Sequence, residues 1–147
     1  MKYYVYEYLR EDGTPYFLTA NHCLGNVNDG AGTSYSASNW SFGFDWFTNT
    51  PDCATFSNTS GPFNPTRVVS GAVLRANRGA SDVALFELNQ TPPASWDLYY
   101  AGWNNSTTPA TSQLSMHHPS GDIMKMSRND QSTVAQTVSG IACWTVA

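Results

Sequence analysis

A histidine and an aspartate stand out for the chemistry that they could perform together. His22 closely follows the apolar run Tyr16–Ala20, which predicts an imidazole held at the tip of a buried strand and facing a cleft. An imidazole titrates near neutral pH, so one that is held rigidly is suited to shuttling protons. Asp82 opens a second apolar run, Val83–Leu88, 60 positions later. A carboxylate beside such a histidine would fix its tautomer and stabilise the imidazolium, so the pair predicts general acid–base chemistry.

Each of these residues alone has an ordinary structural explanation. A histidine followed by a cysteine is more often structural or a metal ligand, and an aspartate that starts a strand is usually a turn or cap residue. With their flanks, however, Tyr16–Cys23 resembles the histidine motif of trypsin-fold serine peptidases, and Ser81–Leu88 resembles their aspartate motif. The resemblance implies that His22 acts as general base and then acid, and that Asp82 orients it.

Two further segments resemble one branch of that fold, the bacterial lysyl endopeptidase-like secreted proteases. Trp96–Trp103 matches an aromatic-Ala-Gly-Trp strand, and Met116–Ser127 contains the pattern His-Pro-Ser-Gly-Asp followed by Lys and Ser. The resemblance covers about residues 14–130. It implies a secreted enzyme that cleaves polypeptides, with lysine as the candidate cleavage site, and it implies no cofactor.

The nucleophilic serine of that family is not found in the sequence. In the family it stands in a Gly-Ser-Ser-Gly-Ser or Gly-Asp-Ser-Gly-Gly turn, where backbone N–H groups form the oxyanion hole. After Asp82, the serines followed by glycine are Ser120 and Ser139, and neither has a glycine two positions before it. We interpret Ser120 as a turn residue. The resemblance therefore places the nucleophile, the oxyanion hole and the substrate pocket beyond Ala147, and we expect no proteolysis from this chain alone.

Three cysteines, Cys23, Cys53 and Cys143, leave an odd thiol. A bridge between Cys23 and Cys53 would close a loop of about 31 residues and contribute roughly 3–4 kcal/mol. The alternative, which the resemblance implies, is that both pair with cysteines N-terminal to Met1. An odd thiol in a secreted chain hints at a missing partner, and charged residues interrupt the segment where a signal peptide would need an apolar core. We therefore expect a chain truncated at both ends.

Other chemistries fit the sequence less well. His117 and His118 are adjacent and would point to opposite faces of a strand, so we expect no metal site, with one ring buried and bonded and the other exposed. The alternating aromatic residues of 39–47 could stack on a carbohydrate or a peptide, but they fit a barrel core better. Glu87 and Asp97 form no convincing acid/base pair, which weakens a glycosidase interpretation.

Composition and charge exclude several further classes of function. Charged residues make up only 12% of the chain, about half the usual share, and aromatic residues make up 14%, which favours an extracellular all-β protein. A net charge of −4 with scattered Lys and Arg disfavours binding to nucleic acid. No apolar run approaches the ~20 residues that cross a membrane.

The elements expected to position His22 and Asp82 are short strands. Residues 3–8 and Tyr16–Ala20 flank a turn and predict a hairpin, and Val83–Leu88 predicts a buried strand. Further strands are expected at 39–47, 66–76, 98–103, 113–117, 134–138 and 141–146. Short strands at regular spacing, without a helical period longer than a turn, indicate a β-barrel or sandwich.

We therefore expect an all-β, trypsin-like double β-barrel. Residues 1–93 would form the N-terminal barrel, partial at its N-terminus, and residues 94–147 the incomplete beginning of the C-terminal barrel. The expected function is a serine endopeptidase whose nucleophile is missing from the chain. Two alternatives stay open: a catalytically inactive remnant or peptide-binding β module, and an unrelated β-sandwich in which His22 and Asp82 would lie far apart. Unpaired strand edges and exposed apolar faces predict poor solubility.

Overall fold

The computed structural model describes residues 6–9, 13–25, 27–32, 35–47, 66–102, 106–119 and 123–145. Every strand in this part pairs antiparallel with its neighbours, and the helices are 3₁₀ turns of three or four residues. The predicted all-β class is therefore confirmed, and the sheets are consistent with a trypsin-type barrel. None of the described helices has the length and apolar character needed to span a membrane.

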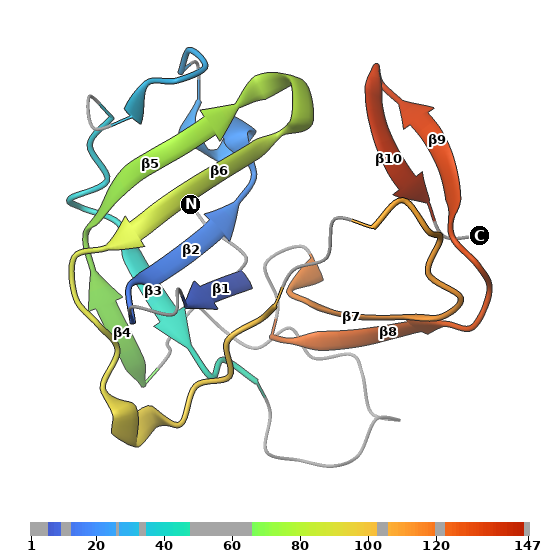
Figure 1. Cartoon of the computed structure of the whole chain (residues 1–147). Coiled ribbons are helices and arrows are strands. Elements are labelled where there is room, and N and C mark those ends of the chain that lie inside the picture. Colours follow the sequence, from blue (N-terminus) through green and yellow to red (C-terminus); the bar gives the residue numbers. More distant parts are fainter. Residues whose placement is uncertain are drawn as a thin grey trace.

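The larger sheet places the predicted hairpin next to the strand that follows Asp82. Its strand order is β1-β2-β6-β5 (Figure 1). These strands are β1 (Tyr6–Leu9), β2 (Pro15–Thr19), β5 (Ala72–Arg78) and β6 (Val83–Leu88). Strand β1 pairs with β2 as the sequence predicts, and β2 continues the sheet by pairing with β6.

A second, two-stranded sheet of β3 (Ser41–Phe44) and β4 (Arg67–Ser70) encloses the core from the other side. The ring of Phe17 on β2 meets that of Phe42 on β3 edge to face, with centroids 4.7 Å apart. The buried apolar residues of the core are Phe17, Leu24, Ala37, Phe42, Phe44, Val69, Ala72, Leu74, Ala84, Phe86 and Leu88. The aromatic alternation of β3 thus contributes to the core, as expected, because Phe42 and Phe44 both point inward.

The single strand predicted over residues 66–76 is wrong, because Gly71 divides it. Gly71 has φ = 78°, a left-handed conformation that favours glycine, and separates β4 from β5. β4 pairs with β3 and β5 pairs with β6, so the bend at Gly71 carries the chain from one sheet to the other. Apolar residues are almost continuous on both sides of Gly71, from Val68 to Leu74, which is why the sequence alone did not indicate the bend.

Strand β5 also contains a bulge that changes which side chains face the core. The register with β6 shifts between Leu74 and Ala76, leaving Arg75 as the additional residue. Strict alternation from Leu74 would turn Ala76 inward, yet Ala76 is exposed and Asn77 is buried. A polar amide thereby enters the interior opposite Ala84.

The C-terminal part consists of two separate hairpins beside the larger sheet (Figure 1). Their strands are β7 (Gln113–His117), β8 (Lys125–Asn129), β9 (Val134–Val138) and β10 (Ile141–Thr145). β7, β9 and β10 match predicted strands, whereas β8 was not predicted. The strand expected at 98–103 is wrong over its described part, because Leu98–Gly102 has no regular structure and Tyr99 is 92% exposed. A run of strand-forming side chains does not make a strand by itself.

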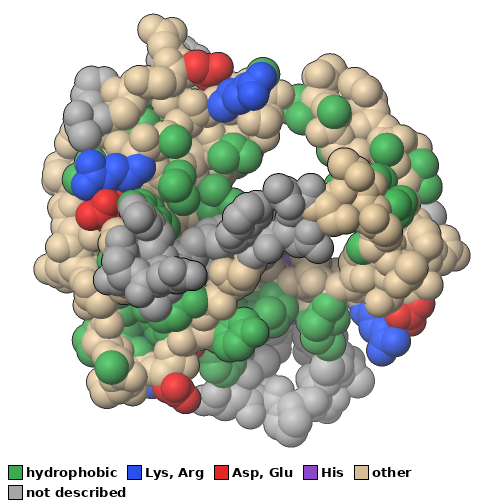
Figure 2. All heavy atoms as spheres, in the orientation of Figure 1, with side chains coloured by type: hydrophobic (Ala, Val, Ile, Leu, Met, Phe, Trp, Pro, Cys, Tyr) green, Lys and Arg blue, Asp and Glu red, His purple; other side chains and the backbone are tan. Residues whose placement is uncertain are grey.

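Apolar side chains of both hairpins remain at the surface. Figure 2 shows hydrophobic side chains on the outside of the β9–β10 hairpin. The large exposed apolar residues of the two hairpins are Leu114, Met116, Met126, Val134, Val138 and Trp144. The hairpins therefore fold by pairing within themselves rather than around a core of their own.

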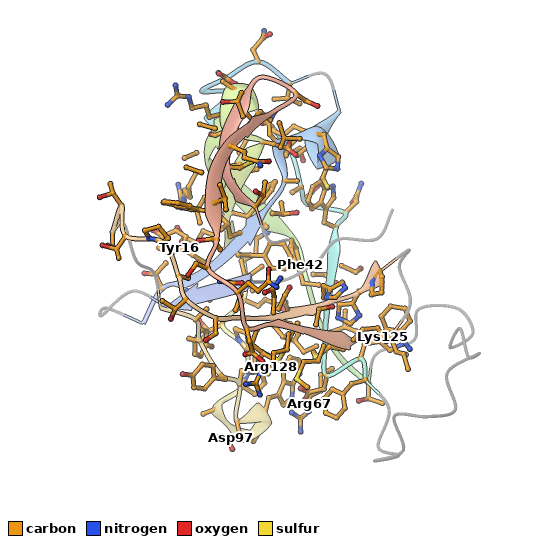
Figure 3. All side chains as sticks on the ribbon, turned by 90° about the vertical axis from the view of Figure 1, so that its right-hand side faces the viewer. Tyr16, Phe42, Arg67, Asp97, Lys125 and Arg128 are labelled. Atoms are coloured by element: carbon orange, nitrogen blue, oxygen red, sulfur yellow. The ribbon has the colours of Figure 1, made fainter. Side chains whose placement is uncertain are left out.

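Contacts made by Trp46 and Arg67 join the later segments to the first sheets. The indole of Trp46 stacks on the ring of His118, with centroids 5.4 Å apart, and its carbonyl accepts a hydrogen bond from the Met124 amide. Arg67 donates to the carbonyl of Trp96 at 2.6 Å, and Arg67 and Asp97 lie at the same end of the molecule (Figure 3).

The expectation for His117 and His118, one ring buried and bonded and the other exposed, is wrong. Both residues are half-buried. The Nδ1 atom of His117 is buried without a hydrogen-bond partner, while His118 is covered by the Trp46 ring. The segment that follows β7 folds back on Trp46, which a single-strand pattern does not reveal.

Candidate active site

The sheet register brings the two predicted catalytic residues to the same edge. Strand β2 runs antiparallel to β6, and their last pair joins Thr19 to Ala84. The chain therefore leaves β2 toward His22 at the point where it enters β6 from Asp82. His22 lies in the 3₁₀ turn η1 (Asn21–Leu24), and Asp82 directly follows the 3₁₀ turn η3 (Gly79–Ser81).

His22 and Asp82 make two hydrogen bonds to each other. The backbone N–H of His22 donates to Oδ1 of Asp82 at 2.8 Å. The ring Nδ1 of His22 lies 2.8 Å from Oδ2 of the same carboxylate. One carboxylate thus holds both the backbone and the ring of the histidine, which fixes the orientation of the imidazole. The β-sandwich alternative, which required these residues to lie far apart, is contradicted.

Local structure explains how each residue is presented. Leu24, two positions after His22, is buried in the core and anchors the end of η1. Asp82 has φ = 49° and ψ = 43°, and its N–H donates to the carbonyl of Gly79. Aspartate enters this left-handed region more readily than most residues. The tight turn and the left-handed residue together aim the carboxylate back over the end of β2.

Electrostatics determine which atom of the pair carries the proton. Burial raises the pKa of Asp82, but the backbone and ring hydrogen bonds of His22, its charge and the Asn21 amide outweigh burial and lower that pKa below its ordinary value. Asp82 is therefore ionised at neutral pH and can only accept hydrogen bonds, so Nδ1 of His22 must donate. Nε2 of the neutral ring then keeps its lone pair and is free to accept a proton.

The histidine ring is open to an incoming group. The side chain of His22 is 75% exposed, against 37% for Asp82, so the carboxylate is tucked behind the imidazole. This arrangement suits a base that must reach a second molecule or a second segment of protein. Strand β10 contacts η3 and so brings the second hairpin close to the Asp82 turn.

Within the described residues, no serine in a nucleophile-type turn lies beside His22 and Asp82. Ser139 lies in the turn between β9 and β10 with φ = 52°, and with Gly140 it closes that hairpin in the I′ manner. Ser120 and Cys53 lie outside the described residues, so the turn role of the former and the Cys23–Cys53 bridge stay predictions. In the described part, no three His, Cys, Asp or Glu side chains gather to hold a metal ion.

Sequence reasoning missed two buried asparagines beside the His22–Asp82 pair. Asn21 directly precedes His22, and Asn77 occupies the inward position created by the bulge in β5. The side-chain amide of Asn77 donates to Oδ1 of Asn21 at 2.9 Å. The signal was present in principle, because a polar amide within the apolar pattern of β5 must find partners if it is buried. The bulge that buries it could not be read from the pattern.

Comparisons with known proteins identify the family of this chain. The family model for the lysyl endopeptidase C-terminal domain matches residues 8–147. The chain is also 37% identical over 98 residues, or 65% of its length, to the lysyl endopeptidase of Pseudomonas aeruginosa. It spans 20% of the length of that relative. With its match extending over almost the whole chain, this protein belongs to the lysyl endopeptidase C-terminal domain family.

Proposed function

We propose that this chain carries the base and the orienting acid of a serine endopeptidase. The observation that carries the proposal is the double contact between His22 and Asp82, with both bonds at 2.8 Å. Such a carboxylate selects the tautomer of the imidazole and stabilises the imidazolium that forms when the ring takes a proton. The membership of a protease family supports the same assignment.

In the proposed reaction, Nε2 of His22 accepts the proton of a serine hydroxyl as the hydroxyl attacks the peptide carbonyl. The imidazolium then returns that proton to the leaving amine, while Asp82 stays ionised and balances its charge. In this proposal, neither His22 nor Asp82 is the nucleophile or part of the oxyanion hole. His22 and Asp82 therefore contribute proton transfer and orientation, but they do not supply the covalent step.

The proposed architecture is the trypsin-like double barrel. Residues 1–93 would form the first barrel, whose core lies between the larger sheet and the β3–β4 sheet, and residues 94–147 would open the second. The division is supported by the burial pattern, since within the described residues no buried apolar residue follows Pro92. The catalytic pair would then lie on the first barrel, facing the strands that follow.

We further propose a polypeptide substrate that is cleaved after lysine and a secreted location. The preference for lysine is supported by the relative, which is named lysyl endopeptidase. The low share of charged residues, 12%, also favours an extracellular protein.

The test expresses the protein encoded by the full reading frame that contains this chain, as wild type and as His22→Ala and Asp82→Asn variants. We expect hydrolysis of a lysyl p-nitroanilide by the wild type and a loss of at least about 10⁴-fold in kcat in both variants. Alanyl and glutamyl p-nitroanilides serve as substrate controls, and hydrolysis of all three at equal rates would reject the preference for lysine. Serine-directed inhibitors should abolish the activity.

The alternative function, an inactive remnant or a peptide-binding β module, predicts another outcome. The protein would then hydrolyse no peptide, although His22 and Asp82 remain in contact. Equal rates for the wild type and the His22→Ala variant would likewise reject the catalytic role of the histidine. The 147-residue chain alone should show no hydrolysis in either case.

A further inference from the structure

Two buried asparagines and one aspartate connect the turn that carries His22 to the turn that precedes Asp82. Figure 1 shows η1 beside the connection between β5 and β6, and the two 3₁₀ turns are in contact. Between them lies the loop of residues 28–31. Hydrogen bonds join this loop to Asn77 and Gly79, and Asn77 in turn donates to Asn21 in η1. The His22–Asp82 pair is therefore held by more than its own two bonds.

Asn77 is the centre of this network. Its Nδ2 donates to Oδ1 of Asn21 at 2.9 Å and to the carbonyl of Asn28 at 3.0 Å. Its Oδ1 accepts from the amide of Ala31 at 3.1 Å. The side chain therefore uses both of its hydrogens and one oxygen lone pair, at a position that is only 9% exposed. A fully bonded amide in a buried position rigidifies the segments that it joins.

The other side of the loop is bonded to the Asp82 turn. Oδ1 of Asp29 accepts a hydrogen bond from the backbone N–H of Gly79, the first residue of η3. A Cβ atom on Gly79 would lie 3.2 Å from that oxygen and 3.5 Å from Nδ2 of Asn21, so the three segments pack closely here. The bonds thus form a closed ring that runs through Asn21, Asn77, the loop, Gly79, Asp82 and His22.

We propose that Asn77 is a positioning residue, which through Asn21 and the 28–31 loop sets the separation of the His22 and Asp82 turns. The bulge in β5 is needed for this role, because without the register shift the side chain of Asn77 would point outward. The role deepens the proposed function, since it matters for catalysis only if the pair is catalytic. The contact that Asn77 maintains can nevertheless be measured in the 147-residue chain without any proteolysis.

The experiment follows the carboxyl of Asp82 by ¹³C NMR titration and the backbone amide proton of His22, which is bonded to that carboxyl. In the wild type the amide proton should shift as Asp82 titrates. In Asn77→Ala we expect the pKa of Asp82 to rise, because the bonds from His22 that lower it are lengthened, and the amide proton should no longer follow the titration.

A second variant separates the hydrogen bonds from the volume of the side chain. Asn77→Asp keeps the size of the residue and the acceptor for Ala31, but it places an oxygen against the oxygens of Asn21 and Asn28. The added carboxylate raises the pKa of Asp82 by its charge alone, so the readout for this variant is the His22 amide proton. If donation by Asn77 sets the geometry, this proton should no longer follow the Asp82 titration in Asn77→Asp, as in Asn77→Ala. An amide proton that still follows the titration in Asn77→Asp but not in Asn77→Ala would overturn the hydrogen-bond role.

The matched control is Thr133→Val, which removes another buried side-chain hydrogen bond. Thr133 is 8% exposed, and its Oγ1 accepts from the amide of Ala110, outside the ring. The control should lower stability in urea without moving the Asp82 titration. If Asn77→Ala also lowered stability but left the Asp82 titration unchanged, Asn77 would have a purely structural role and the proposal would be wrong. Should Asn77→Ala fail to fold, Asn21→Ala, which removes one bond of the ring, decides the question by the same readout.

Discussion

Strands β6 and β9 are similar in length, but they differ in what they bury. β6 turns Ala84, Phe86 and Leu88 into the core, whereas every side chain of β9 is exposed. Both strands pair antiparallel with a neighbour, so backbone pairing does not distinguish them. The difference is that β6 has the β3–β4 sheet facing it. A strand pattern thus specifies pairing, while burial requires a second layer.

The contrast between the part that has a buried core and the two C-terminal hairpins also explains the position of the candidate site. The His22–Asp82 pair lies at the edge of the part that has a core, where η1 is anchored by buried Leu24. The hairpins carry their apolar residues outward, which is consistent with the poor solubility predicted for the isolated chain. A catalytic geometry needs rigid support, and only the first region supplies it.

A matched pair of leucine substitutions tests the comparison most strongly. Leu74 is fully buried and Leu114 is 58% exposed. Leu74→Ala should lower the free energy of unfolding by about 3–4 kcal/mol through lost burial and a cavity, whereas Leu114→Ala should change it by less than about 0.5 kcal/mol. Urea denaturation of the two variants measures both values. Equal losses would mean that the hairpins share a core with the rest of the chain.

Two turn glycines should show a smaller difference. Gly71 and Gly140 both have positive φ, at 78° and 83°, so alanine is strained at either position. Around Gly140 a new Cβ would meet nothing within 4 Å, but at Gly71 it would lie 2.6 Å from Nδ2 of Asn89 and 3.3 Å from the carbonyl of Ser38. We expect losses of about 1 kcal/mol for Gly140→Ala and about 2–4 kcal/mol for Gly71→Ala in thermal or urea unfolding. A larger loss at Gly140 would reverse the contrast between the two regions.

Acid should weaken the His22–Asp82 contact, and we expect this change to have the smallest effect on stability of the three comparisons. The pKa of Asp82 in the folded chain lies below the ordinary value of 3.8, so its contribution is present above that pH and is lost as the pH falls through the folded pKa. The difference in unfolding free energy between wild type and Asp82→Asn should therefore shrink between about pH 5 and pH 2.

The hairpin control for this titration is Asp130→Asn. Asp130 pairs with Arg128 at 2.8 Å, but both side chains are more than half exposed, at 62% and 71%. Exposed ion pairs contribute little, so this variant should match the wild type across the same pH range. If Asp82→Asn behaved like Asp130→Asn, the His22–Asp82 contact would contribute nothing to the folded state.

Much of the site could be predicted because its signals are local. The apolar run before His22 and the one after Asp82 indicated two neighbouring buried strands, and these are β2 and β6. The I′ turn of Ser139 and Gly140 lies between two predicted strands for the same reason. Such features depend on residues within a few positions of one another, and their physical cause is the steric preference of short segments.

Only the tertiary structure decided which of these segments became the support of the site. The bend at Gly71 and the bulge after Leu74 arise because β4 and β5 must pair with different neighbours while keeping their apolar residues inside. These two departures from strict alternation place Asn77 in the interior, next to Asn21 and close to the His22–Asp82 pair. The sequence by itself indicated most of the strands and the two candidate side chains, His22 and Asp82. The packing of the sheets around the core decided the distance between His22 and Asp82 and the burial of the amides that support them. Packing between segments that are distant in the sequence leaves no local pattern.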